Sequence, residues 1–243
     1  MKKSIFTLLA IIALVSCTDL EEDVLDTALG DDLLYGEGAA EGVLAPVYAN
    51  MYQLFNNQEH YFLLQEISTD ECIVPYRGGT DWYNGGRLIE MFQHTWTPNH
   101  GNIQGVWQGL TSGIAKALIV GQTIGSDHPY ANEALGMVAF YNTCLLDLYG
   151  IVLEKDPEDF NTGTLSRVLR GQEAIDYIIG ILDRIEPELK TKAELGAAGS
   201  TRFTISAAHA LRARLLLNKA VYLDRYANSF TFATADMDEV INY

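Results

Sequence analysis

The sequence is poor in positive charge. It contains 16 lysine and arginine residues against 32 aspartate and glutamate residues, which gives a formal net charge of −16. A nucleic-acid-binding protein needs a basic surface for the phosphates, and electrostatic binding to anionic lipid needs clustered basic side chains. The composition therefore argues against both classes of partner and leaves neutral ligands open.

Cysteine is also scarce, with three in the chain: Cys17, Cys72 and Cys144. No further cysteine or histidine stands at ligand spacing from Cys72 or Cys144, so a zinc site is not expected. In an exported protein these two cysteines could form a disulfide. Alternatively, both are buried and behave as small apolar side chains.

Motifs that mark enzymes are missing. The chain has no Gly-x-Ser-x-Gly, His-Glu-x-x-His, P-loop or dinucleotide-binding pattern. Asp70 and Glu71 are adjacent, so on an extended segment they point apart and cannot flank a glycosidic bond together. His94 and His100 lack a third ligand pattern and are interpreted as structural histidines. We expect a protein that is not an enzyme and uses no cofactor or metal.

The first 17 residues have the pattern of an export signal. Lys2 and Lys3 precede an apolar run at 5–15, which is too short to span a bilayer. The run ends at Ser16-Cys17, similar to a bacterial lipoprotein cleavage site. We predict a signal peptide over residues 1–16 and lipidation of Cys17. A lipid anchors a protein without spanning the membrane. Residues 17–38 are predicted to form an acidic tether.

Helical periodicity dominates the rest of the chain, residues 39–243, and strand signal is sparse. Helices are expected at 40–55, 103–124, 130–149, 172–185, 204–223 and 236–243. Gly150 is expected to stop the third of them, residues 151–169 are expected to be irregular, and 190–200 to form a mobile linker. The fold class is mostly α. The pairing of helices over 103–149 and 172–223 favours tetratricopeptide-like helix pairs.

One long segment, residues 76–107, interrupts this helical pattern. It holds all three tryptophans and six of the 21 glycines, and we expect an irregular loop. Within it, 77–86 is a candidate recognition tip because glycines can hold aromatic rings at the surface. Residues 92–107, with Phe92, Trp96 and Trp107, are expected to pack the loop onto the helices.

Several motifs occur in the order found in one family. The first is the lipoprotein site at Cys17. The second is Ser68-Thr69-Asp70-Glu71, followed by Arg77-Gly78-Gly79 and Asp81-Trp82-Tyr83-Asn84-Gly85-Gly86. The others are His94-Thr95-Trp96-Thr97-Pro98, then Leu146-Asp147-Leu148-Tyr149-Gly150, and finally Ser206 to Leu215. In this order they resemble the N-terminal half of the SusD/RagB family of outer-membrane nutrient-binding lipoproteins. Members continue beyond the equivalent of residue 243, so the chain is interpreted as truncated at its C-terminus.

The resemblance implies a function for the tip. Members are lipid-anchored at the cell surface of Bacteroidetes, bind oligosaccharides, and act with a TonB-dependent β-barrel transporter (SusC-like) in polysaccharide uptake. It implies ligand contact by Trp82, Asn84 and Arg77. Tyr83 adds a second ring and Asp81 a double acceptor, and rings beside rigid polar groups suit sugars.

Other interpretations remain open. Trp82 and Tyr83 could instead cover an interface with the transporter or with a further part of the chain. The protein could be a helical-repeat interaction subunit, or a peptide-binding lid of the transporter, since the family includes members that serve peptide uptake.

The sequence departs from the family pattern at one of the quoted motifs. Where members often carry a proline after Tyr149-Gly150, this chain has Ile151.

Overall fold

The computed structural model describes residues 37–57, 60–75, 77–78 and 83–243. As predicted, the fold is mostly α. The long helices are α3 (Glu37–Asn56), α6 (Gly101–Ile124), α7 (Pro129–Tyr149), α8 (Gly171–Ile185) and α10 (Ile205–Leu223). The short ones are α4 (Tyr61–Glu66), α5 (Arg87–Phe92), α9 (Lys192–Leu195) and α11 (Thr234–Asn242).

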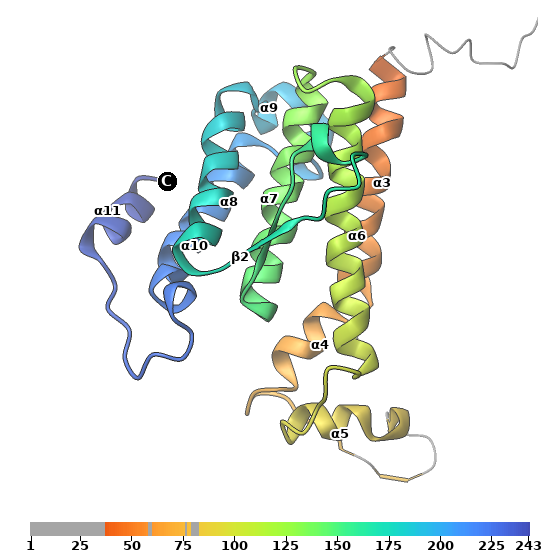
Figure 1. Cartoon of the computed structure of the whole chain (residues 1–243), viewed down its shortest axis with the longest axis vertical. Helices are drawn as coiled ribbons and strands as arrows, with labels where there is room; N and C mark the ends of the chain where they lie inside the picture. The colour runs from red at the N-terminus through yellow and green to blue at the C-terminus, as the bar shows by residue number, and fades with distance from the viewer. Residues whose placement is uncertain (1–36, 58–59, 76, 79–82) are drawn as a thin grey trace, which may run out of the picture.

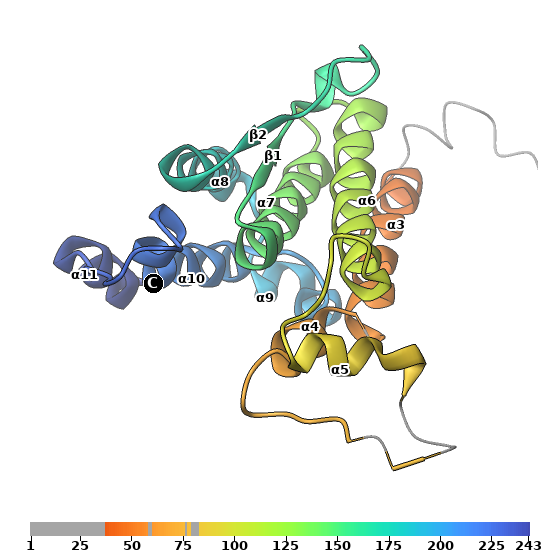
Figure 2. The same cartoon turned by 60° about the horizontal axis from the view of Figure 1, so that its bottom comes forward.

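Helix α7 is the centre of the molecule. It forms a hairpin with α6 and also packs against α3, α8 and α10, while α11 lies on α10 (Figures 1 and 2). Of its 21 residues, 14 are buried. Its sequence is rich in apolar and small residues on every side, as a helix surrounded by other helices requires. The other long helices are therefore positioned by what they pack against on α7.

Two glycines allow the close approach of neighbours to the α6–α7 hairpin. A Cβ atom added at Gly113 would lie 2.5 Å from the ring of Tyr141, and one added at Gly136 would lie 2.3 Å from the ring of Phe203. Both are closer than real Cβ contacts. The absence of a side chain therefore lets the buried Tyr141 ring pack against α6 and the buried Phe203 ring pack against α7.

The predicted stop of α7 at Gly150 is confirmed. Gly150 adopts the left-handed conformation, with φ 70°, and its N–H donates to the carbonyl of Leu146. The guanidinium of Arg225 also donates to the carbonyls of Leu146, at 2.6 Å, and Asp147. A cation at this end of a helix is favourable because the carbonyls there carry partial negative charge.

Two predicted irregular segments are more regular than expected. Residues 151–169 contain the strands β1 (Val152–Glu154) and β2 (Arg167–Leu169), paired antiparallel with Val152 opposite Leu169. The expected mobile linker at 190–200 contains α9 and the 3-10 helix η4 (Gly196–Ser200). Thr191 and Glu194 form a reciprocal capping box at the start of α9.

Cys72 and Cys144 are not joined in a disulfide, so the pairing considered from the sequence is wrong. The alternative of two buried thiols holds for Cys144, whereas Cys72 is half-buried. Burial raises the pKa of the Cys144 thiol to about 12, because a thiolate there would lose its hydration.

Candidate functional site

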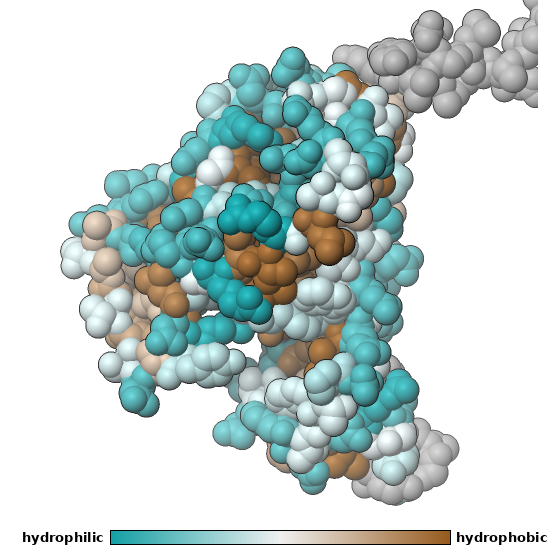
Figure 3. Space-filling view, viewed as in Figure 1, coloured by the Kyte–Doolittle hydropathy of each residue, from teal (hydrophilic) through white to brown (hydrophobic). Residues whose placement is uncertain are grey.

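The predicted recognition tip lies at one end of the molecule. There α4 and α5 lie at the ends of α3 and α6, and residues 68–75 extend away from the long helices (Figure 2). In the space-filling view this end is joined to the remainder through a narrower region, and hydrophilic side chains cover much of the face shown (Figure 3). Leu88 and Met91, both buried, attach α5 to the core.

The backbone at the start of α5 is unusual. Asn84, Gly85 and Gly86 form the 3-10 helix η1 (Asn84–Gly86) with successive positive φ values of 43°, 68° and 87°. Asparagine and glycine tolerate this left-handed region better than other residues. The N–H of Gly86 donates to the carbonyl of Tyr83 at 2.7 Å, which closes a tight turn. The turn presents Tyr83 and Asn84 next to each other.

Three of the predicted ligand contacts can be placed. The Tyr83 side chain is 46 % exposed, and Arg77 and Asn84 are exposed as well. All three belong to the segment between α4 and α5. Trp82 and Asp81, the other two predicted contacts, and the predicted lipidation site Cys17 lie outside the described residues.

The expected anchor of the loop is confirmed in part. Trp107 lies on α6, packs against the core, and meets Tyr149 edge-on with ring centroids 5.3 Å apart. Phe92 and Trp96, however, are 40 % and 38 % exposed. The expectation of core packing is therefore wrong for these two residues, because the loop is not irregular throughout: α5 buries Leu88 and Met91 in their place.

The two histidines of the loop have structural partners. The Nε2 atom of His94 lies 2.8 Å from the carbonyl of Ser68, and that of buried His100 lies 3.1 Å from the carbonyl of Arg87. The His94 contact ties the loop to the turn after α4. The His100 contact ties the start of α6 to the start of α5. Across the described ranges, no group of three or more His, Cys, Asp and Glu side chains could hold a metal ion.

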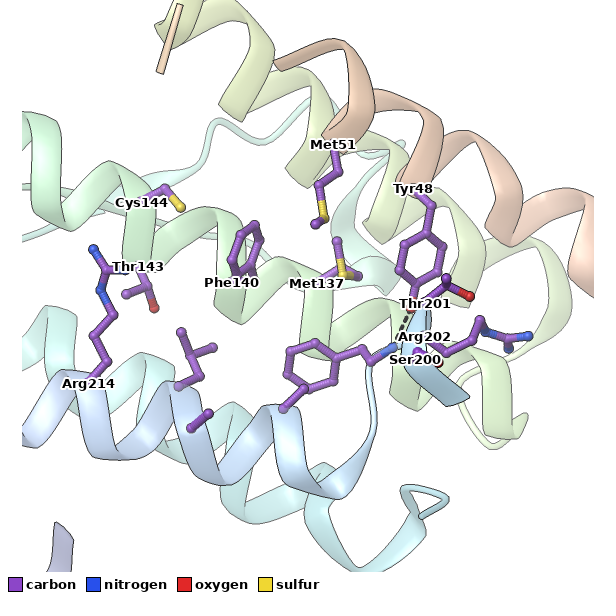
Figure 4. A pocket seen from close by; sticks show the side chains of 14 residues that line it. Tyr48, Met51, Met137, Phe140, Thr143, Cys144, Ser200, Thr201, Arg202 and Arg214 are labelled. Carbon is purple, nitrogen blue, oxygen red and sulfur yellow. Dashed lines mark hydrogen bonds between the residues drawn. The ribbon is translucent and has the colours of Figure 1, made fainter. Parts of the chain in front are cut away.

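A second site was not predicted from the sequence. A groove of about 380 Å³ runs over α7, between α3 and α10 (Figure 4). We call it the α7 groove. It is lined by Tyr48, Met51, Met137, Phe140, Thr143, Cys144, Ser200, Thr201, Arg202, Phe203, Ala207, Ala210, Leu211 and Arg214. The sequence showed that several of these lie on apolar helix faces, but not that the two walls stand apart.

An ion pair between buried Glu133 and half-buried Arg202 closes one end of the α7 groove. Arg202 forms two hydrogen bonds with Glu133, of 2.5 Å from Nε and 2.6 Å from Nη2, and its guanidinium lies 4.8 Å from the ring centre of Tyr130. The hydroxyl of Tyr48 donates to Glu133 and accepts from the N–H of Phe203 at 2.7 Å. Burial and the charge of Glu133 raise the pKa of Tyr48. The network holds residues 202–203 against α3 and α7.

The other end of the α7 groove also has an ion pair, which is more exposed. The guanidinium of Arg214 pairs with the carboxylate of Asp147, which also accepts from the hydroxyl of Tyr222. Burial raises the pKa of Tyr61, beside Cys144, and the Cys144 thiol contributes to that rise. At neutral pH these phenols and the thiol are uncharged. The charged groups at the groove are therefore the two arginines and the carboxylates that pair with them.

No helix among those described is both long and apolar enough to cross a membrane. No family model matches the chain, and no curated protein matches it.

Among solved structures, a chain named BT4246, which is a Bacteroides thetaiotaomicron locus tag, is similar to this one. The two sequences are 26 % identical, and the TM-score is 0.54. The match covers 75 % of this chain and 31 % of that chain, so this chain spans less than a third of the length of its neighbour. The similarity points to a Bacteroidetes protein and establishes no family.

Proposed function

We propose that this chain is a cell-surface lipoprotein that binds a glycan through its tip and passes it to a TonB-dependent outer-membrane transporter. The observation that carries the proposal is the exposed ring of Tyr83 beside exposed Asn84, on a turn held at the start of α5. The proposed family is SusD/RagB, on the order of motifs in the sequence; the likeness to BT4246 supports the coarser assignment to the Bacteroidetes.

The chemistry of the tip suits a sugar. A pyranose ring has a flat face of C–H groups that packs against an aromatic ring, and its edges carry hydroxyl groups that need donors and acceptors. Tyr83 and Trp82 supply rings in this proposal, Asn84 supplies an amide that both donates and accepts, Arg77 supplies a forked donor and Asp81 a double acceptor. No proton transfer is required of any of them.

The geometry of the turn favours binding. Three successive residues with positive φ are held by one short hydrogen bond and by the buried side chains of α5. A side chain that is ordered before the ligand arrives loses less conformational entropy on binding. We infer that Tyr83 and Asn84 are presented in their binding arrangement.

Lipidation of Cys17 would place the chain on the outer membrane, and the acidic tether would hold it away from the bilayer. The transporter is proposed as the partner on the resemblance alone. Labelling cells with a palmitate analogue tests the anchor: Cys17→Ser is expected to lose the label, and a persistent label would remove the lipoprotein proposal.

Replacement of the Tyr83 ring tests glycan binding directly. Native gels that contain a panel of soluble plant and host polysaccharides should identify one that retards the full chain. Tyr83→Ala and Trp82→Ala are each expected to weaken that binding by about 1–2 kcal/mol, roughly five- to thirtyfold, because the stacking contact is lost.

Tyr226→Ala is the matched control, since Tyr226 is 94 % exposed in the segment between α10 and α11. It should migrate as the parent chain does. Equal retardation of Tyr83→Ala, Trp82→Ala and the parent chain would show that the tip is not the sugar site. If peptides bind and no polysaccharide does, the glycan proposal fails.

A further inference from the structure

The α7 groove has the shape of a small-molecule site. Its floor runs along α7 from Met137 to Cys144, which is about 10 Å of helix. Side chains of α3 and α10 form its two walls, and residues 200–203 close one end (Figure 4). Ligand pockets in proteins are typically concave, largely apolar, and about 300–1,000 Å³ in volume. The groove, at about 380 Å³, falls within this range.

The lining of the α7 groove favours aromatic ligands. Met51 and Met137 reach it from α3 and α7, and the ring of Phe140 lies between these thioethers and the Cys144 end (Figure 4). Phe203 adds a second ring on the α10 side. Thioether sulfur atoms make favourable contacts with aromatic rings, and aromatic rings pack edge-to-face or offset against one another.

The charges at the α7 groove favour a neutral ligand. Its lining contains two arginines, and each is engaged by a carboxylate: Arg202 by Glu133 and Arg214 by Asp147. An anionic ligand would have to displace one of these carboxylates, and a cationic ligand would meet a neighbouring guanidinium. The groove and its pairs therefore match an uncharged molecule.

The volume of the α7 groove suits a small occupant. A cavity of about 150 Å³ lined by apolar side chains is sufficient for one benzene ring. The groove has more than twice that volume, which is enough for two rings.

We propose that the α7 groove binds a small, uncharged molecule with two aromatic rings. Met51 and Phe140, both half-buried, contact the rings above the buried Met137 and Phe203. The exposed Thr201 hydroxyl, which donates to the carbonyl of Ala198, can accept a hydrogen bond from a polar substituent. This site lies on the helical body, apart from the tip, and does not depend on the proposed glycan binding.

Titration of the full chain with 2-naphthol, followed by ligand-observed NMR, tests the proposal. Ala210 lies on the α10 wall, and Ala210→Trp should fill the α7 groove and weaken binding at least tenfold. Ser206→Trp places the same side chain at an exposed position of α10 outside the lining, and should bind within twofold of the parent chain. 2-Naphthoate, which carries a carboxylate, should bind at least tenfold more weakly than 2-naphthol.

Three results would overturn the proposal. One is the absence of 2-naphthol binding up to its solubility limit. A second is equal binding by the parent chain, Ala210→Trp and Ser206→Trp, which would place the ligand elsewhere. The third is a dimer in sedimentation that Ala210→Trp converts to a monomer, which would show that a second copy covers the α7 groove. Circular dichroism of both tryptophan variants confirms that they are folded.

Discussion

Arg202 joins its own segment to α7 and to α3, which are distant from it in sequence. Its guanidinium pairs with Glu133 on α7, lies over the ring of Tyr130, and is 3.5 Å from the carboxylate of Glu41 on α3. The hydrogen bonds with Glu133 raise its pKa, so the guanidinium stays charged. Breaking a buried ion pair leaves one charge without a partner, which is more costly than the loss of an exposed pair.

Arg202→Met is therefore expected to lower the free energy of unfolding by about 3 kcal/mol. Arg167→Met is the matched control because Arg167 pairs with Glu154 at 2.5 Å while its side chain is 70 % exposed; it should change stability by less than about 1 kcal/mol. Urea unfolding measures both. A change in Arg202→Met as small as that in the control would mean that the pair does not stabilise the fold.

The role of Arg202 could not be predicted from the sequence. It follows a glycine- and alanine-rich segment that was interpreted as a linker, and its partner Glu133 is 69 residues away. By contrast, the conformations of Asn84, Gly85 and Gly86 follow from local chemistry, because asparagine and glycine tolerate positive φ values better than other residues. Local backbone preferences are visible in a sequence, while long-range pairs depend on the packing of whole helices.

At the scale of elements, the glycines of the long helices have opposite roles. Gly113 on α6 is in contact with the ring of Tyr141, whereas a Cβ atom added at Gly180 on α8 would have no neighbour within 4 Å. Alanine is favoured over glycine in a helix interior by about 1 kcal/mol. The sign of a glycine-to-alanine change therefore depends on the space available.

Gly180→Ala should raise the free energy of unfolding by about 0.5–1 kcal/mol. Gly113→Ala should lower it by about 1–3 kcal/mol, because the buried Tyr141 ring has to move. Thermal and urea unfolding of the two variants form a matched pair, with the same substitution in two helices. If both changes have the same sign, the close packing of α6 on Tyr141 is not a determinant of stability.

The long helices were predicted within a few residues because periodicity over 15 or more residues is a strong signal. The strands β1 and β2 have three residues each, too few for an alternating pattern. α9 is equally short, although its capping box at Thr191 and Glu194 is visible in the sequence. The burial of Leu88 and Met91 changed the interpretation of the loop, since a six-residue helix replaces the aromatic anchor expected there.

For the whole molecule, burial of uncharged acids makes stability depend on alkaline pH. Burial raises the pKa of Cys144 and that of Tyr141 to about 12, and also raises the pKa of Tyr48 and Tyr61. In the unfolded chain these groups ionise near pH 8.5 and 10. Between those values and their folded pKa, the unfolded chain releases protons that the folded chain retains.

The contribution of these groups to the free energy of unfolding should therefore be constant below about pH 8.5 and fall above it. Each such group contributes a slope of about 1.4 kcal/mol per pH unit once the unfolded group is ionised. Urea unfolding at a series of pH values from 8 to 11 measures the slope. In Cys144→Ala the decline between about pH 9 and 10 should be shallower by this amount; an unchanged decline would contradict the assignment to Cys144.

The position of the tryptophans has a consequence for spectroscopy. All three lie in residues 82–107, and Trp107 sits edge-on to Tyr149 where α6 meets the end of α7. Tryptophan fluorescence therefore reports on the end of the molecule that carries the tip, whereas far-ultraviolet circular dichroism reports on the helices as a whole. Unfolding curves that coincide by both signals indicate that tip and body melt together, and an earlier fluorescence transition indicates that the tip opens first.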